Sequence, residues 1–267
     1  CLAGRLAGRL DGLGPARLAQ PRQGVSGLGE EASWMLIALL ATRCLMQRTG
    51  KGSRPMASGT TQLDAGLMQA ITDRQARVAV IGLGYVGLPL AVTAAKAGFA
   101  VTGLDIDATK TTRLDAGTSY IDAVSDADLT AVAGRFAWST DFARLAKADV
   151  IVICVPTPLT RQREPELSFV DTTARSIATH LRPGTLGVLE STTWPGTTRE
   201  VLIPILEAGG LKSGADILVG FSPEREDPGN TSFRTATIPK IVAAEGAMAG
   251  ALTEAYYGAV VDTVVRV

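Results

Sequence analysis

The sequence predicts an α/β fold in which helices cover both faces of a doubly wound, mostly parallel sheet. From residue 75 onward, short apolar runs alternate with segments of helical period. This alternation is typical of βαβ units, whose right-handed crossovers produce a parallel sheet. A glycine-rich turn, GLGYVG, joins the first apolar run to the first helical segment, and several later runs end in polar loops. These observations together indicate a Rossmann-like arrangement.

The individual elements follow from the same patterns. Expected strands are apolar runs bounded by turn residues, at 77–82, 100–105, 149–155, 185–190, 216–220, 239–244 and 260–266. Expected helices have apolar residues recurring every three or four positions, at 86–97, 107–116, 126–133, 140–147, 169–181 and 197–208. We expect residues 56–74 to lead into the first strand and residues 75–267 to form one domain.

Residues 1–55 are expected to lie outside this domain. They are rich in Gly, Ala, Leu and Arg, with eight basic residues against three acidic ones. The apolar run 34–42 is too short to span a bilayer, and no convincing small-residue cleavage site follows it. We expect translation to begin at Met56 and the preceding residues to be disordered or untranslated. A membrane-surface or targeting segment is the alternative.

Composition excludes several functions for the chain. Basic and acidic residues balance at 26 each, which leaves no electrostatic footprint for nucleic acid or an anionic membrane. Three widely spaced cysteines, Cys1, Cys44 and Cys154, predict no disulfide framework and a cytoplasmic location. Cys154 lies in the run VIVICV and is expected to be a buried small hydrophobe rather than a reactive thiol. The single histidine, His180, excludes a His-rich metal site and is expected near a helix C-terminus.

The turn after the first strand has the spacing G-x-G-x-x-G. Gly82 ends the strand, Gly84 allows the backbone to approach a pyrophosphate, and Gly87 allows the helix to pack against the strand. The helix N-terminus adds N–H groups and a positive dipole for the phosphates, with Tyr85 and Val86 beside them. A tight strand-helix corner would show the same spacing, but the flanking strand and helix favour a dinucleotide site.

A carboxylate at the end of the second strand selects the dinucleotide. Asp105 lies eighteen residues after Gly87, where it can accept hydrogen bonds from ribose hydroxyls and repel a 2′-phosphate. Ile106 and Asp107 follow, so no arginine there compensates that phosphate. The sequence therefore predicts NAD, rather than NADP, as the cofactor.

Three polar loops follow strands and are expected at the same edge of the sheet, at 154–168, 190–198 and 221–230. Their prolines and glycines alone would indicate no more than strand ends. Their Thr, Ser and Glu side chains favour a site beside the nicotinamide that holds a sugar alcohol and manages its proton.

Five motifs in this order resemble the UDP-glucose/GDP-mannose dehydrogenase family: GLGYVGLPLA, GLDID, CVPTPL, ESTTWPGTT and FSPEREDPGN…IPKIV, over residues 77–244. The sequences of these motifs are most similar to those of the branch that oxidises UDP-N-acetylglucosamine. The resemblance implies oxidation of C6 of a UDP-sugar to the uronate for surface polysaccharide. Two NAD⁺ are consumed, and a cysteine traps the aldehyde and forms a thioester. Intact members are homodimers.

The resemblance also implies roles for three residues. Thr157 lies in the VPTP turn that contacts the cofactor. Thr192, in ESTT, is implied to contact the cofactor and to hold the catalytic water or substrate. Glu224, in SPE, is implied to orient water or assist thioester hydrolysis.

The family's nucleophilic cysteine, in a GG-x-C segment, and its central helix are missing from a sequence that ends at Val267. We therefore expect a catalytic fragment that binds NAD weakly without completing the oxidation, and dimerisation is left open. A non-catalytic NAD-binding module is the alternative. The 6-phosphogluconate and β-hydroxyacid dehydrogenases share the fold, but ESTTWPGTT followed by FSPEREDPGN argues against them.

Overall fold

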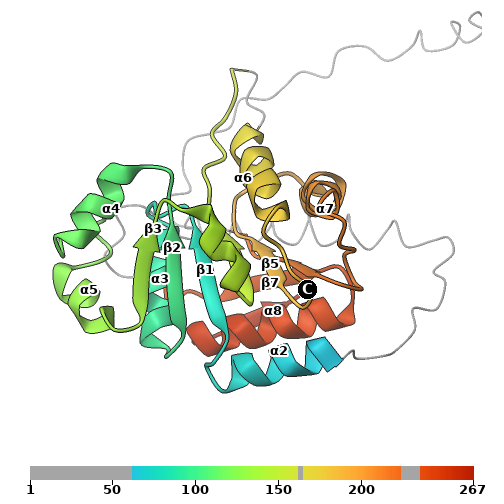
Figure 1. Ribbon diagram of the computed structural model, residues 1–267, viewed down its shortest axis with the longest axis horizontal. Helices are drawn as coiled ribbons and strands as arrows, with labels where there is room; N and C mark the ends of the chain where they lie inside the picture. Colours follow the sequence, from blue (N-terminus) through green and yellow to red (C-terminus); the bar gives the residue numbers. More distant parts are fainter. Residues whose placement is uncertain (1–61, 162–164, 224–234) are drawn as a thin grey trace, which may run out of the picture. The chain divides into compact units, whose positions relative to one another are not determined.

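The computed structural model describes residues 62–161, 165–223 and 235–267 (Figure 1). They belong to one compact unit, Gly59–Val267. The predictions for residues 1–55 and for a start at Met56 lie outside the described residues.

One sheet of eight strands forms the centre of the described residues, in the order β3-β2-β1-β4-β5-β6-β7-β8. The strands are β1 (Arg77–Ile81), β2 (Ala100–Leu104), β3 (Phe136–Ser139), β4 (Val150–Ile153), β5 (Leu186–Leu189), β6 (Leu218–Phe221), β7 (Lys240–Ala244) and β8 (Val264–Arg266). Neighbouring strands are parallel except β6 and β7, which are antiparallel. The predicted mostly parallel, Rossmann-like sheet is therefore confirmed, and its strand order reverses between β1 and β4.

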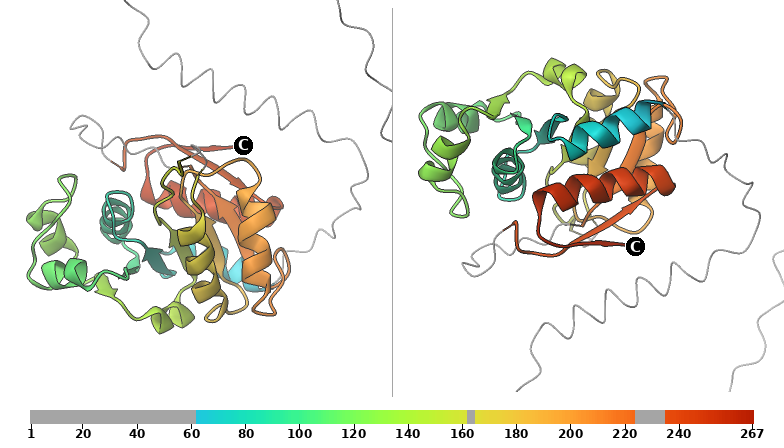
Figure 2. Two further views of the ribbon diagram at one scale, coloured as in Figure 1. Left: turned by 90° about the horizontal axis from the view of Figure 1, so that it is seen from above. Right: turned by 90° about the horizontal axis from the view of Figure 1, so that it is seen from below.

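Helices pack on both faces of the sheet (Figures 1 and 2). They are α2 (Gln62–Thr72), α3 (Gly87–Lys96), α4 (Ala108–Asp115), α5 (Asp126–Val132), η1 (Phe142–Lys147), α6 (Ser168–Ala178), η2 (Thr198–Leu202), α7 (Ile203–Glu207) and α8 (Ala247–Val260). Side chains alternate along a strand. Val78 and Val80 of β1 therefore enter the core beneath α2, α3 and α8, while Ala79 and Ile81 enter the core beneath α6 and α7.

Several predicted elements need correction. The segment 140–147 is a 3₁₀-helix, η1, rather than an α-helix. The segment 197–208 is a π-helical turn, η2, followed by the short α7. Pro204 at the start of α7 lacks an N–H, so a regular α-helix cannot run through this point.

Three elements of the described residues were not predicted from the sequence. The lead-in contains α2, which packs against α8 in the lower part of Figure 1. Helix α8 itself was not predicted, because it is rich in Ala and Gly and carries no clear polar face. It extends to Val260, which confines the predicted strand 260–266 to β8. The edge strand β3 was also missed, because only one of its four residues is buried and no continuous buried apolar run marks it.

An ionic cluster joins the amino-terminal ends of the central strands. Asp149, just before β4, accepts hydrogen bonds from the backbone N–H of Arg77 at 2.8 Å and from its Nε at 3.0 Å. Arg182, in the turn before β5, donates to the other carboxylate oxygen. Burial alone would raise the pKa of Asp149, but the hydrogen bonds from Arg77 and Arg182 outweigh it and lower that pKa.

We expect Asp149→Asn to lower the free energy of unfolding at pH 7 by about 2 kcal/mol, because it weakens hydrogen bonds to a charged group. The lowered pKa means that the stabilisation is complete above the pKa of the unfolded carboxyl, about 4, and is lost as the pH falls through the folded value. Urea unfolding measured at pH 7 and at low pH should therefore show the free energies of unfolding of wild type and Asp149→Asn converging in acid.

Asp171→Asn is the matched control, because Asp171 pairs with Arg175 in an exposed i,i+4 contact. Exposed pairs of this kind contribute little to stability. Equal losses in the two variants at pH 7 would contradict a special role for the cluster at Asp149.

Candidate functional site

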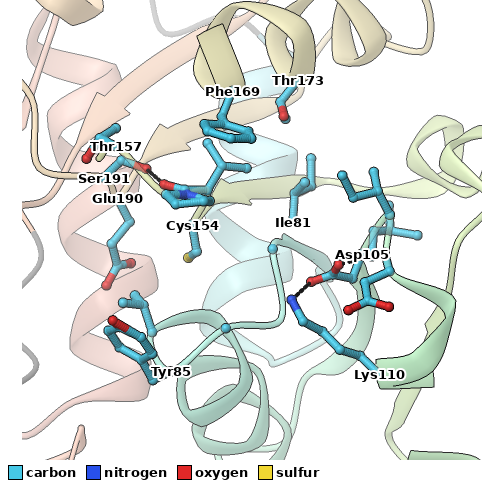
Figure 3. Close-up of a pocket in the computed structure, with 18 of the residues that line it drawn as sticks. Ile81, Tyr85, Asp105, Lys110, Cys154, Thr157, Phe169, Thr173, Glu190 and Ser191 are labelled. Carbon is cyan, nitrogen blue, oxygen red and sulfur yellow. Dashed lines mark hydrogen bonds and ion pairs between the residues drawn. The ribbon is translucent and has the colours of Figure 1, made fainter. Parts of the chain in front are cut away.

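A cavity of about 660 Å³ opens at the carboxyl ends of the central strands (Figure 3). Its walls come from the turn between β1 and α3, the end of β2, and the loops that follow β4 and β5. It lies where the strand order reverses, which is the position expected for a ligand in a doubly wound sheet. The structure thus brings together four of the segments singled out in the sequence.

The glycine turn leaves one face of its backbone open. Gly82 has a φ of +89°, and a Cβ there would lie 2.6 Å from the carbonyl oxygen of Cys154. A Cβ on Gly87 would overlap the carbonyl oxygen of Gly82. A Cβ on Gly84 would meet no protein atom within 4 Å, although Gly84 lines the cavity. Protein packing therefore explains Gly82 and Gly87, whereas the bare backbone at Gly84 fits a ligand that approaches closely.

Asp105 lies at the end of β2 and is only 5 % exposed. One carboxylate oxygen accepts from the backbone N–H of Leu83 at 2.8 Å and from Nζ of Lys110 at 2.7 Å. The other accepts from the backbone N–H of Asp107 at 2.9 Å. The carboxylate is therefore held in one orientation at the cavity wall, where it can still accept a hydrogen bond from a hydroxyl.

Sequence reasoning missed Lys110, although a local signal was present. Asp107 is the N-cap of α4 and accepts from the backbone N–H of Thr109 at 2.9 Å. A helix that begins there brings the residue one turn later, Lys110, back toward Asp105. Lys110 places a cation beside the predicted ribose site. From the sequence, only an arginine was considered at this site, and so Lys110 was not included.

Tyr120 was also missed, and it supports the same turn. Its hydroxyl donates to the carbonyl oxygen of Leu83 at 2.9 Å. Burial, together with the charges of Asp105 and Asp107, raises the pKa of Tyr120. The phenol therefore stays protonated and remains a donor at neutral pH.

The loops after β4 and β5 are tied to each other at the opposite wall. Thr157 donates from Oγ1 to the carbonyl oxygen of Thr192 at 2.7 Å. Ser191 donates from Oγ to the carbonyl oxygen of Val155 at 2.7 Å. All four residues line the cavity, so the predicted Thr157 and Thr192 are brought together. The remaining predicted residue, Glu224, lies outside the described residues.

Apolar side chains surround the polar groups of the cavity. Tyr85 is 56 % exposed and Ile106 is 81 % exposed, and both line it together with Val86 and Phe169. Such exposed flat or branched side chains suit the faces of planar heterocyclic rings. Tyr85 and Val86 therefore occupy the region in which the sequence predicted them.

Cys154 and His180 have the surroundings expected from the sequence. Cys154 is 7 % exposed and belongs to the core, although it also borders the cavity. His180 lies just after the end of α6 and donates its backbone N–H to the carbonyl oxygen of Ile177 at 2.8 Å. It does not line the cavity.

Glu190 is a buried residue of the cavity that the sequence analysis did not single out. It is 2 % exposed, at the end of β5. Lys240 and Tyr257 both donate to its carboxylate. No local pattern connects three residues so far apart in the sequence.

Among the described residues, neither a metal-ligating cluster nor a membrane-spanning helix occurs. No group of three or more His, Cys, Asp or Glu side chains in it is arranged to hold a metal ion. Among its helices, none combines the length and the hydropathy needed to cross a membrane.

Comparisons with known proteins match the same part of the chain. Residues 76–260 match the model of the UDP-glucose/GDP-mannose dehydrogenase family, NAD-binding domain. The chain is 35 % identical over 182 residues to a UDP-N-acetyl-D-glucosamine 6-dehydrogenase of Pseudomonas aeruginosa, covering 68 % of this chain and 43 % of that protein. It is 33 % identical over 184 residues to a UDP-N-acetyl-D-mannosamine dehydrogenase of Pyrococcus horikoshii, covering 68 % and 44 %.

Solved structures agree with these sequence matches. The UDP-D-ManNAc dehydrogenase of Pyrococcus horikoshii superposes with a TM-score of 0.67 at 33 % identity, over 71 % of this chain and 46 % of that one. A ternary complex of GDP-mannose dehydrogenase from Pseudomonas aeruginosa gives a TM-score of 0.66 at 30 % identity, over 71 % and 46 %. The chain spans less than half the length of each of these relatives.

Proposed function

The chain belongs to the UDP-glucose/GDP-mannose dehydrogenase family, and from this premise we propose that its cavity binds NAD for the oxidation of a nucleotide sugar at C6. One observation carries the cofactor assignment. Gly84 leaves open space between two tightly packed glycines, beside the helix N-terminus of α3 and next to Leu83, whose N–H donates to the buried carboxylate of Asp105. This combination fits a pyrophosphate next to a ribose.

The two halves of the cofactor contact different walls of the cavity. The backbone at Gly84 and the N-terminus of α3 bind the pyrophosphate, and Asp105 accepts a hydrogen bond from an adenosine ribose hydroxyl. The nicotinamide half lies toward the loops of Thr157 and Thr192, on the β4 and β5 side. When bound there, NAD⁺ supplies the hydride acceptor for oxidation of the sugar.

The substrate proposed for the whole enzyme is UDP-N-acetylglucosamine. The motif ESTTWPGTT and the 35 % identity to a UDP-N-acetyl-D-glucosamine 6-dehydrogenase support it. In the reaction, one C6 alcohol and one water are converted into a carboxylate while two NAD⁺ become two NADH and three protons are released. Thr192 holds the water or substrate. Glu224 orients water or assists hydrolysis of the thioester that the resemblance implies for the family's cysteine.

An NAD-binding module without dehydrogenase chemistry is the second candidate. Its support is Cys154, the cysteine of the described residues, which is 7 % exposed within the core and lies in VIVICV rather than in a GG-x-C segment. A thiol so enclosed is a poor candidate for the attacking nucleophile.

Calorimetric titration of the full chain with NAD⁺ and NADP⁺ tests the cofactor assignment. We expect saturable binding of NAD⁺ and at least about tenfold weaker binding of NADP⁺, because a 2′-phosphate would meet the Asp105 carboxylate. Absence of NAD⁺ binding by the folded chain would contradict the proposal.

NADH absorbance then tests whether this chain by itself carries out the oxidation. The chain is incubated with NAD⁺ and UDP-N-acetylglucosamine, UDP-N-acetylmannosamine or GDP-mannose. NADH formed from the first sugar would support the dehydrogenase over the binding module and overturn the expectation that this chain does not complete the oxidation. Cofactor binding without NADH from any of the three sugars is the result expected for this chain under both candidate functions.

A further inference from the structure

A buried cluster of charged and polar groups lies behind the cavity wall. Glu190 is 2 % exposed, Lys240 is 4 % exposed and Tyr257 is fully buried. The Lys240 ammonium donates to one oxygen of the Glu190 carboxylate, and the Tyr257 hydroxyl donates to the other. The cluster thereby connects the end of β5, the start of β7 and the helix α8.

Stability alone does not explain this cluster. Removing a carboxylate and an ammonium from water is costly, and well-packed apolar residues of similar volume often serve a fold equally well. A buried ion pair can instead fix one specific geometry of the groups that it joins. Burial and the nearby Glu190 charge raise the pKa of Tyr257, so its hydroxyl remains a donor at neutral pH.

One end of the cluster reaches the proposed cofactor site. Glu190 lines the cavity, and so do the next two residues, Ser191 and Thr192 (Figure 3). The backbone N–H of Glu190 also donates to the carbonyl oxygen of Ile153 at 2.8 Å. With both carboxylate oxygens and the backbone held, residue 190 has little freedom to move.

We propose that Lys240 and Tyr257 are positioning residues that clamp the Glu190 carboxylate and so hold Ser191 and Thr192 in place for the nicotinamide half of the cofactor. The inference rests on the proposed NAD site. The two clamping side chains act through Glu190 and need not contact the cofactor. Preorganised groups of this kind improve binding because less order has to be created when the ligand arrives.

The chain contains a matched pair of variants for the test. Tyr256 precedes Tyr257 in α8, is also fully buried, and contacts it with ring centroids 5.0 Å apart. Its hydroxyl has no hydrogen-bond partner among the described residues. Tyr257→Phe thus removes a hydrogen bond to Glu190, whereas Tyr256→Phe removes the same atom without one.

For Tyr257→Phe we expect the NAD⁺ dissociation constant to rise by about fivefold or more, since small displacements of positioning groups have effects of this order or larger. Tyr256→Phe should stay within about twofold of wild type. Amide hydrogen exchange gives a second readout. Exchange at residues 190–192 should accelerate in Tyr257→Phe while β1 keeps its protection, whereas a purely structural defect would follow the global stability.

Three variants test the role of Lys240, and one of them, Lys240→Arg, retains the positive charge. Lys240→Met leaves an unpaired buried carboxylate and is expected to destabilise the fold, so Glu190→Gln with Lys240→Met serves as the folded comparison. The double variant should bind NAD⁺ about fivefold or more weakly, and Lys240→Arg should recover part of that affinity.

The outcomes distinguish this inference from the function on which it rests. Equal NAD⁺ affinity in Tyr257→Phe and Tyr256→Phe, or wild-type affinity in the double variant, would overturn the clamp and leave the cofactor site standing. A wild-type chain that fails to bind NAD⁺ would overturn both. Weakened binding with locally faster exchange would support the clamp.

Discussion

Gly84→Ala is expected to weaken NAD⁺ binding by about a hundredfold, equivalent to about 2.7 kcal/mol, while the free energy of unfolding stays nearly unchanged. The added methyl would meet no protein atom within 4 Å, and Gly84 does not have the positive φ that strains other residues. The methyl would instead occupy the space into which the pyrophosphate has to come. Isothermal titration and thermal unfolding of the same preparation measure the two quantities.

Two other glycines act as controls for this prediction. Gly87→Ala would overlap the backbone carbonyl of Gly82, so we expect it to lose stability as well as affinity. Gly258→Ala, in α8, would also meet no atom within 4 Å, but Gly258 does not line the cavity. It should bind NAD⁺ like wild type and gain slightly in helix stability. Unchanged affinity in Gly84→Ala would contradict the placement of the pyrophosphate.

Asp105→Ser is expected to reduce the preference for NAD⁺ over NADP⁺ by about a hundredfold, by weakening NAD⁺ binding and improving NADP⁺ binding together. The substitution removes the carboxylate that accepts from the ribose and repels a 2′-phosphate. It also releases Lys110, whose Nζ lies 2.7 Å from the Asp105 carboxylate. The freed ammonium can then pair with the 2′-phosphate.

Lys110→Met separates the two parts of this effect. Added to Asp105→Ser, it should abolish the gain in NADP⁺ affinity while leaving the loss of NAD⁺ affinity. Because Asp105 also accepts from the backbone N–H of Leu83, each titration needs the stability of the same variant beside it. A folded Asp105→Ser protein that still discriminates against NADP⁺ as wild type does would place the ribose elsewhere.

The fold class, most of the strands and the cofactor turn could be predicted from the sequence alone. These features depend on neighbours a few residues apart. Apolar runs define β1 and β4, and the spacing of Gly82, Gly84 and Gly87 reflects the contacts of one turn. The carboxylate of Asp105 follows from its place at the end of the next strand. Local periodicity failed for α8, whose nearly uniform apolar surface carries little positional information.

The side chains that lie behind the cavity wall could be identified only from the three-dimensional packing of the chain. The Glu190 carboxylate meets Lys240 and Tyr257, which are 50 and 67 residues away in the sequence. The antiparallel return of β7 and the packing of α8 bring them together. Hydrogen bonding and charge pairing act through space at about 3 Å, whereas sequence patterns report only contacts along one element. Lys110 differs from these residues, because it lies five positions after Asp105 and the helix N-cap at Asp107 is a local signal for the contact.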